Sequence, residues 1–346
     1  MKALVYTGKK LKYVSDHPEP ELDEWDVLIK VKACGICGTD MAIVNGTLPT
    51  PVPIIPGHEI SGIIEAVGKE VSKRENIIGK PVTAEINTNT CGKCSFCISG
   101  APTQCPERKA LGIDVDGGFA EHIVVHRDLV HELPRNLDFR EATLIEPLAA
   151  AIQTFERMPL VQSDDYVVIL GAGKLSLLIL QVIKALYDWP LILVLGHHDY
   201  KLQLAGKLGA FKTLNTRKMT EKDIIKAVNE FSDERGANIV IEATGNPHAI
   251  REAILMTRPR GKIGLKSTHG ESVPFDMTTA VVKEIDFYTS RCGPFEKAID
   301  LIRKNKIKLK ELISSVFPLS RGIEAFKMMD ERRDSIIKIV LEINRE

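Results

Sequence analysis

Two groups of residues in the sequence have the types and spacing of metal ligands. The first lies in 91-CGKCSFCISGAPTQC-105, where four thiols fall within fifteen residues: Cys91, Cys94, Cys97 and Cys105. Four thiolates fill the coordination sphere of a tetrahedral zinc ion and leave no position for a substrate. The spacing therefore predicts a closed, structural zinc site, whose metal stabilises a loop that has few apolar residues of its own.

The second group is sparser. The segment 34-CGICGTD-40 contains Cys37, and 56-PGHEISG-62 presents His58 and Glu59 after a Pro-Gly turn. A catalytic zinc ion needs about three protein ligands and an open position, and thiolate, imidazole and carboxylate all suit it. The spacing alone leaves two alternatives open, a redox dithiol at the C-x2-C pair and a His-Glu pair that merely forms part of a turn.

A glycine turn follows an apolar strand in 166-YVVILGAGKLS. Gly171 and Gly173 lie between the strand and a helix that begins near Lys174 and Leu175, where glycine lets the backbone approach a pyrophosphate at the helix N-terminus. The third position of the pattern is Ser176 rather than glycine. The pattern predicts dinucleotide binding, and the alternative is an ordinary strand-to-helix turn.

The tip of the next strand bears on which dinucleotide binds. The segment 191-LILVLGHHDYK has no carboxylate at the strand end, and offers instead Gly196, His197, His198 and Lys201. A carboxylate there would accept hydrogen bonds from the adenosine ribose and repel a 2′-phosphate, so its replacement by histidines favours NADP over NAD. The alternative is that Asp199 bends back to the ribose and that the histidines are only exposed to solvent.

These candidate sites lie in two regions that differ in their expected pattern of strands and helices. Up to about residue 145, short β-branched runs alternate with glycine and proline, and the expected strands are 26-DVLIKVKA, 60-ISGIIEAVG, 80-KPVTAEI and 118-GFAEHIVV. From about residue 147, apolar strands at 166, 191, 238, 262 and 286 alternate with helical segments. This βαβ alternation predicts an α/β fold with a doubly wound parallel sheet. The last part of the chain is expected to contain helices near 294 and 321 and a strand near 336.

Composition limits the partners. The 346 residues contain 46 Lys and Arg against 46 Asp and Glu, so no charge excess favours nucleic acid or an acidic membrane surface. No apolar run is long enough to span a bilayer and the N-terminus does not resemble a targeting peptide, so a cytoplasmic protein with a small-molecule partner is expected. Seven cysteines with C-x2-C spacings in such a chain indicate metal binding rather than disulfides.

Five motifs in this order resemble the zinc-dependent medium-chain dehydrogenase/reductase family, which includes alcohol, polyol, sugar and threonine dehydrogenases. They are GICGTD, PGHEISGIIEAVG, the four-cysteine segment, 146-EPLA-149 and GAGKL. The resemblance covers essentially the whole chain. It implies a Rossmann domain over 148–292 and a β-rich, GroES-like catalytic domain formed by 1–147 and 293–346.

The resemblance also implies roles for individual residues. Cys37, His58 and Glu59 match the catalytic zinc site, together with Glu146, where relatives have either cysteine or glutamate. Asp40 would hold His58 in its ligating tautomer, and Thr39 would pass the substrate proton towards solvent. At the nicotinamide end of the cofactor the candidates are weaker: Thr244, Gly245, Ser267, Thr268 and Arg291.

The expected activity is reversible hydride transfer between a substrate alcohol and NAD(P), with two zinc ions per chain, one catalytic and one structural. The glutamate at position 146 and the polar run 45-NGTLPTP favour a polyol or sugar, a simple primary or secondary alcohol is second, and an amino alcohol such as threonine is third. Two alternatives are disfavoured because the sequence contains both ligand sets. A zinc-stabilised redox sensor would lack the catalytic ligands, and a zinc-free reductase would lack both sets. The family resemblance further implies a homo-oligomer, a dimer or tetramer formed through the edge strand near 286-DFYTS.

Overall fold

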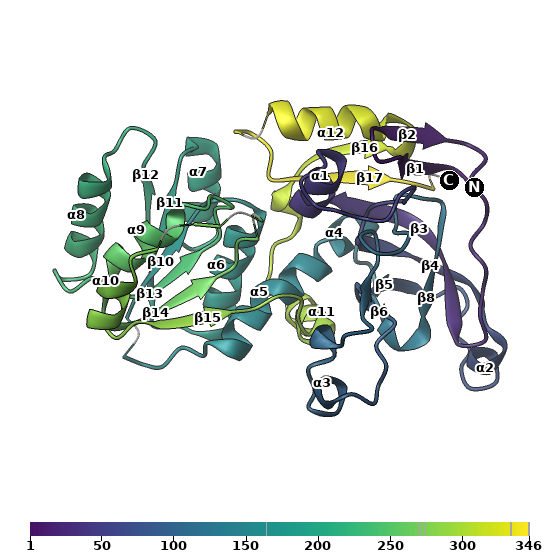
Figure 1. The fold of residues 1–346 in the computed structure, drawn as a ribbon, viewed down its shortest axis with the longest axis horizontal. Helices are drawn as coiled ribbons and strands as arrows, with labels where there is room; N and C mark the ends of the chain where they lie inside the picture. Colours follow the sequence, from purple (N-terminus) through teal and green to yellow (C-terminus); the bar gives the residue numbers. More distant parts are fainter. Residues whose placement is uncertain (164, 269, 271, 274, 333, 345–346) are drawn as a thin grey trace. The chain divides into compact units, whose positions relative to one another are not determined.

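The computed structural model describes residues 1–344 except 164, 269, 271, 274 and 333. The chain forms two compact units, each with its own sheet (Figure 1). Unit 1 contains Met1–Glu146 and Leu309–Glu346, and unit 2 contains Pro147–Lys308.

Unit 2 is built on a six-stranded sheet, and all its strands are parallel in the order β12-β11-β10-β13-β14-β15. The strands are β10 (Tyr166–Leu170), β11 (Leu191–Gly196), β12 (Lys212–Asn215), β13 (Ala237–Glu242), β14 (Thr257–Leu265) and β15 (Asp286–Thr289). The associated helices are α5 (Ile145–Arg157), α6 (Lys174–Leu186), α7 (Asp199–Lys207), α8 (Glu221–Phe231), α9 (Ala249–Met256), α10 (Met277–Val282) and α11 (Phe295–Arg303). The chain runs outward from β10 to β12 and then returns to β13, so the strand order reverses between β10 and β13, where open α/β sheets bind their ligands.

The inner strands β10 and β11 of unit 2 consist almost entirely of apolar residues, as is typical of parallel strands that helices cover on both faces. On one face, residues of α8, α9 and α10 pack with Val168, Leu193, Val240 and Ile263 in a single buried cluster. The predicted doubly wound parallel sheet is confirmed.

Unit 1 is built on a sheet in which β3 is the central strand. The order is β16-β17-β3-β4-β5-β9, and β8 pairs with β3 beside β17. The strands are β3 (Asp26–Ile36), β4 (Glu59–Val67), β5 (Pro81–Ala84), β8 (His122–His126), β9 (Val130–Glu132), β16 (Ile313–Pro318) and β17 (Lys338–Glu342). Alternate residues Val27, Ile29 and Val31 of β3 are buried, as expected for a strand with one face on the core.

The other elements of unit 1 are short. Two ribbons pair β1 (Ala3–Tyr6) with β2 (Leu11–Val14) and β6 (Asn87–Thr88) with β7 (Lys109–Ala110). The helices are α1 (Gly38–Val44), α2 (Lys69–Ser72), α3 (Ser95–Ile98), α4 (Phe139–Ala142) and α12 (Gly322–Glu331), with 3₁₀ turns η1 (Pro102–Gln104), η2 (Arg127–Leu129), η3 (Lys310–Leu312) and η4 (Leu319–Arg321). The predicted β-rich first region is confirmed.

The second domain boundary differs from the prediction. Segment 293–308, which we assigned to the GroES-like domain, groups with unit 2. Lys297 of α11 forms an ion pair with Glu156 of α5 at 2.7 Å, and the backbone N–H of Lys308 donates to Gln181 Oε1 of α6 at 2.7 Å. These contacts attach the segment to unit 2, and only the chain from Leu309 onward belongs to unit 1.

None of the helices in the described part of the chain combines the length and the apolar character that crossing a bilayer requires.

Candidate metal and cofactor sites

The sparse ligand group converges in unit 1. Cys37 immediately precedes α1, His58 immediately precedes β4, and Glu59 is the first residue of β4. One ligand atom from each of these three residues lies within 4.8 Å of the other two, and His58 and Glu59 are buried. Gly57, before them, has φ 97°, and a side chain there would meet Phe119 at 2.8 Å, so the tight turn before His58 requires glycine.

Asp40 holds this arrangement together. It is fully buried; its Oδ2 accepts from the Cys37 N–H at 2.7 Å and its Oδ1 from the Gly57 N–H at 3.1 Å. The same Oδ1 lies 3.6 Å from His58 Nδ1. Because Asp40 faces Nδ1, the other ring nitrogen, Nε2, is left to bind a metal, as second-sphere carboxylates arrange in metal sites.

The charges of this site depend on one another. Burial lowers the pKa of His58, but the carboxylate of Asp40 and the thiol of Cys37 outweigh burial and raise the pKa well above its usual range. The Asp40 carboxylate and the Cys37 thiol beside the ring thus favour positive charge at this position. A divalent cation would satisfy the same anionic surroundings.

Lys338 is a neighbour of the candidate site that the sequence alone did not reveal. It is the first residue of β17, it is fully buried, and its ammonium group forms an ion pair with the fully buried Glu59 carboxylate. Lys338 Nζ also donates to the Ile36 carbonyl at 2.8 Å, and burial lowers the pKa of Lys338 to about 8. The available signal was one lysine inside the apolar run 336-IIKIVLEI.

The two remaining catalytic candidates differ in position. Thr39 lies beside the cluster, and its Oγ1 is 3.9 Å from Cys37 Sγ. Glu146 lies in the first turn of α5 and is half-buried, and it is not part of the cluster of three. Its role as a zinc ligand stays a prediction.

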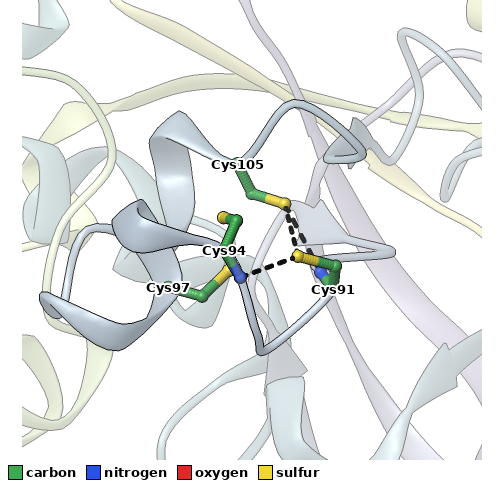
Figure 2. A group of neighbouring side chains, drawn as sticks. All are labelled: Cys91, Cys94, Cys97 and Cys105. Carbon is green, nitrogen blue, oxygen red and sulfur yellow. Dashed lines mark hydrogen bonds between the residues drawn. The ribbon is translucent and has the colours of Figure 1, made fainter.

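The four-cysteine segment forms the second cluster. The ligand atoms of Cys91, Cys94, Cys97 and Cys105 lie within 4.8 Å of one another around α3 and η1 (Figure 2). The Cys91 N–H donates to Cys105 Sγ and the Cys94 N–H donates to Cys91 Sγ, each at 3.4 Å, while the Cys105 and Cys91 sulfurs are 3.6 Å apart.

The surroundings of these thiols shift their pKa values in opposite directions, and only Cys105 is shifted towards the thiolate. The backbone N–H of Cys91 is the main cause that lowers the pKa of Cys105 to about 7, whereas burial is the main cause that raises the pKa of Cys97 to about 12. Opposite pKa shifts of this kind are expected for neighbouring thiols that cannot all ionise without a cation. Both the donor set and the convergence of the four sulfurs fit a tetrahedral zinc ion.

The predicted cofactor residues lie along the edge of the unit 2 sheet that is formed by the carboxyl ends of its strands. Because all the strands are parallel, their carboxyl ends meet at this edge. The residues lie at the end of, or after, β10 (Gly171, Gly173, Lys174, Leu175), β11 (Gly196, its last residue, and His197, His198, Lys201), β13 (Thr244, Gly245), β14 (Ser267, Thr268) and β15 (Arg291).

The turn between β10 and α6 is shaped for close approach. Gly171 has φ 99°, and Gly173 precedes α6 with open space where a side chain would lie. Ser176, which stands where the pattern has a third glycine, is buried, and its hydroxyl donates to the Ala243 carbonyl at 3.4 Å. The serine is therefore accommodated by a polar contact between α6 and the end of β13.

At the end of β11, His197 is exposed and His198 and Lys201 are half-buried. Asp199, the alternative partner for a ribose, accepts a hydrogen bond from Asn215 Nδ2 of β12 at 2.6 Å. In this conformation the Asp199 carboxylate is directed to the neighbouring strand.

Comparisons with known proteins agree with both units. A family model described as the alcohol dehydrogenase GroES-like domain matches residues 23–135, and one described as zinc-binding dehydrogenase matches residues 175–304. A sorbitol dehydrogenase of Halalkalibacterium halodurans is 32% identical over 347 residues, which cover 99% of this chain and 99% of that protein. The chain belongs to the zinc-type medium-chain dehydrogenase family. This family assignment confirms the predicted class of NAD(P)-dependent dehydrogenase.

Solved medium-chain dehydrogenase structures have the same fold. An alcohol dehydrogenase from Escherichia coli CFT073 complexed with NADH has a TM-score of 0.89 and 27% identity, with 99% of each chain covered. A zinc-binding dehydrogenase from Sinorhizobium meliloti 1021 bound to NADP has a TM-score of 0.87 and 27% identity, with 99% of this chain and 98% of that chain covered. Because one relative holds NADH and the other NADP, the fold alone does not select between the two cofactors.

Proposed function

We propose that this medium-chain dehydrogenase reversibly oxidises a secondary hydroxyl of a polyol or sugar to a carbonyl, with hydride transfer to NAD(P). The observation that carries the proposal is the convergence of Cys37, His58 and Glu59 within 4.8 Å in a buried site. These residues, joined by the Glu146 carboxylate as a fourth ligand, would hold the catalytic zinc ion. A bound zinc ion supplies Lewis acidity, which makes a substrate hydroxyl easier to deprotonate.

Within this proposal the protein groups orient the ligands and move a proton. Asp40 keeps His58 in one orientation, and the Lys338 ammonium balances the charge of Glu59. The Thr39 hydroxyl, next to Cys37, is the first acceptor for the substrate proton. In many relatives a histidine three residues further continues such a relay, and here that position is Ala42.

Polyols and sugars are the substrate class that we favour. Glu146, the polar loop 45-NGTLPTP and the sorbitol dehydrogenase relative support this class over simple alcohols and over threonine. A panel of polyols, aldoses, simple alcohols and threonine, assayed by absorbance of the reduced cofactor with NAD and with NADP, tests the proposal. Turnover of polyols or sugars at the highest kcat/KM is the expected result, and oxidation of simple alcohols alone would contradict it.

We propose NADP as the preferred cofactor. His197, His198 and Lys201 at the end of β11 supply donors or positive charge to a 2′-phosphate, and the Asp199 carboxylate is bonded to Asn215. Replacing His197 by aspartate should shift the ratio of NADPH to NADH affinity towards NADH, since a carboxylate repels the 2′-phosphate and accepts from the free ribose. An unchanged ratio would mean that the end of β11 is not the selector.

We also propose two zinc ions per chain, one in each cluster. Metal analysis should find about two equivalents. One equivalent, with the four clustered cysteines titrating as free thiols, would contradict the two-site proposal.

A homo-oligomer in the cytoplasm completes the proposal. Among the described residues, the parallel edge strand β15 has no neighbour on its outer side in the sheet order, and Met277, Val281 and Val282 of α10 expose apolar side chains. Such a surface supports association between identical subunits. Reduced cysteines arranged for metal binding support a reducing compartment. Light scattering would distinguish a dimer or tetramer from a monomer.

A further inference from the structure

We infer that Glu242 is a positioning residue for the nicotinamide carboxamide, a role that rests on the cofactor site proposed above. Glu242 is the last residue of β13 and is buried with 4% of its surface exposed. It lies one strand beyond the point where the sheet order reverses. A buried carboxylate at this edge is costly unless hydrogen bonds satisfy it.

Three donors surround a single oxygen of this carboxylate. Glu242 Oε1 accepts from the Thr244 N–H at 2.8 Å, from the Thr244 hydroxyl at 2.6 Å and from the Ser267 hydroxyl at 2.9 Å. The side chain therefore connects the loop after β13 to the segment that follows β14. The hydroxyl protons of Thr244 and Ser267 are both directed at Glu242.

Each hydroxyl also accepts a backbone hydrogen bond. The Asn246 N–H donates to Thr244 Oγ1 at 2.9 Å, and the Gly245 N–H donates to Ser267 Oγ at 2.8 Å. A hydroxyl has one proton and two lone pairs. Among the described residues, each of the two hydroxyls is left with one lone pair and no proton to offer. Because Glu242 accepts both hydroxyl protons, the Thr244 and Ser267 hydroxyl oxygens can only accept further hydrogen bonds.

The path of the cofactor places its nicotinamide near this pair. In a doubly wound sheet the pyrophosphate lies at the turn after β10, and the adenosine ribose lies at the end of β11. The other half of the dinucleotide must then extend over the ends of β13 and β14, on the opposite side of the reversal point. The nicotinamide carboxamide has two N–H donors, and a site that offers only acceptors orients its amino group.

A purely structural tie is the competing role for Glu242, and the two roles predict different binding. If the carboxylate only fastens the loop, its removal weakens every ligand of this edge alike. If it sets the two hydroxyls as acceptors, its removal affects only ligands that carry the carboxamide amino group. The 3-acetylpyridine analogue of the dinucleotide, in which a methyl group replaces that amino group, separates the roles.

The experiment measures dissociation constants by calorimetry on the full zinc-loaded chain. The ligands are the preferred oxidised dinucleotide, its 3-acetylpyridine analogue, and the matching ADP-ribose, which lacks the ring. The wild type should prefer the carboxamide by about tenfold, since one to two hydrogen bonds contribute about 1 kcal/mol each. In Glu242→Ala this preference should disappear, while the affinity for ADP-ribose changes by less than about twofold.

Two further variants keep the test decisive. Glu242→Gln should retain the preference, because the amide oxygen can accept the same protons. Thr244→Val removes one acceptor and should reduce the preference even if Glu242→Ala does not fold. Thr257→Val is the matched control, since its hydroxyl donates to Ala253 O at the other end of β14, and it should leave the preference unchanged.

Retention of the preference in Glu242→Ala or in Thr244→Val, or an equal loss for all three ligands, would overturn the inference and leave the proposed cofactor site intact. Failure of the wild type to bind either dinucleotide would overturn the proposed function and the inference together.

Discussion

The two candidate metal sites of this chain place similar chemistry in opposite surroundings. The four cysteines of the proposed structural site come from one segment of fifteen residues in which three of them are partly exposed. Cys37, His58 and Glu59 come from the N-terminal ends of α1 and β4, and Asp40 and Lys338 complete their surroundings from α1 and β17. The first site requires only a loop that folds around a metal, while the second requires the whole sheet of unit 1.

The difference lies in how each site satisfies its charges. A zinc ion held by the four thiolates would offset half of their charge, and the backbone N–H groups of Cys91 and Cys94 donate to two of the sulfurs. The buried carboxylates of Glu59 and Asp40 are surrounded by groups that compensate them without a metal: the Lys338 ammonium, the His58 ring and two backbone N–H groups. We therefore expect the fold to pre-organise the proposed catalytic site, and a bound metal to organise the four-cysteine loop.

The largest expected effect is the loss of turnover on replacing Cys37 by alanine. The variant should bind about one zinc ion less and lose at least about a thousandfold in kcat/KM, because zinc contributes several kcal/mol to the transition state and each 1.4 kcal/mol is tenfold. Metal analysis with steady-state kinetics measures both. The fold, dinucleotide binding and the zinc of the four-cysteine loop should remain, and surviving turnover would contradict the catalytic assignment.

The matching change in the other site, Cys94→Ala, should have the opposite profile. The loop should lose its metal and its local order, because metal binding and folding are coupled there. We expect trypsin to cleave after the exposed Lys93, and a decrease in melting temperature of several degrees, since about 1 kcal/mol corresponds to about 2–4 °C in a domain of this size.

Retained catalytic zinc in Cys94→Ala is the control for this comparison. Loss of both metals from either single variant would show that the two sites are not independent.

Lys338→Met tests whether the catalytic site is pre-organised by charge. It leaves the Glu59 carboxylate buried without its ammonium partner, which should destabilise the protein by about 3–5 kcal/mol in the zinc-free state. Chemical denaturation with and without zinc measures the effect. A bound zinc ion should restore part of the stability, because it supplies positive charge to the same carboxylate.

Two variants serve as controls for Lys338. Lys338→Met combined with Glu59→Gln should recover much of the loss, since neither charge is then left alone. Gly35→Ala should also disturb the pair, because a side chain at Gly35 would collide with the Lys338 and Glu59 side chains. Equal stability of Lys338→Met and wild type without zinc would contradict the pre-organised model.

The same contrast shows what the sequence could predict. The four-cysteine site follows from spacing, because all its ligands lie in one short segment and no other part of the fold is required. The parallel sheet follows from the alternation of apolar strands and helices, and the residues at its edge follow from the strand ends. Cys37, His58 and Glu59 required the family resemblance, because Cys37 is distant in sequence from the other two and the spacing alone is equally compatible with a redox dithiol and a simple turn.

Lys338 and the domain boundary could not be predicted, for physical reasons. A lysine in a strand is ordinarily exposed, and only the pairing of β17 with β3 reveals that this one is buried beside Glu59. The boundary near 293 was placed where the last strand ends, but ion pairing and hydrogen bonding with α5 and α6 hold segment 293–308 in unit 2. Both features depend on tertiary contacts that leave no local pattern.

The smallest expected effect is that of Asp40→Asn, which keeps the size of the side chain and removes its charge. The amide oxygen can still accept from the Cys37 or the Gly57 N–H, but the ring of His58 loses the carboxylate that faces Nδ1. Loss of such a second-sphere partner lowers metal affinity by about 10–100-fold. Competition with a chromogenic chelator should therefore show weaker binding of one zinc ion, while the zinc of the four-cysteine loop dissociates as in the wild type. Unchanged affinity at both sites would mean that backbone contacts alone orient His58, and the pre-organisation would then rest on the Glu59–Lys338 pair.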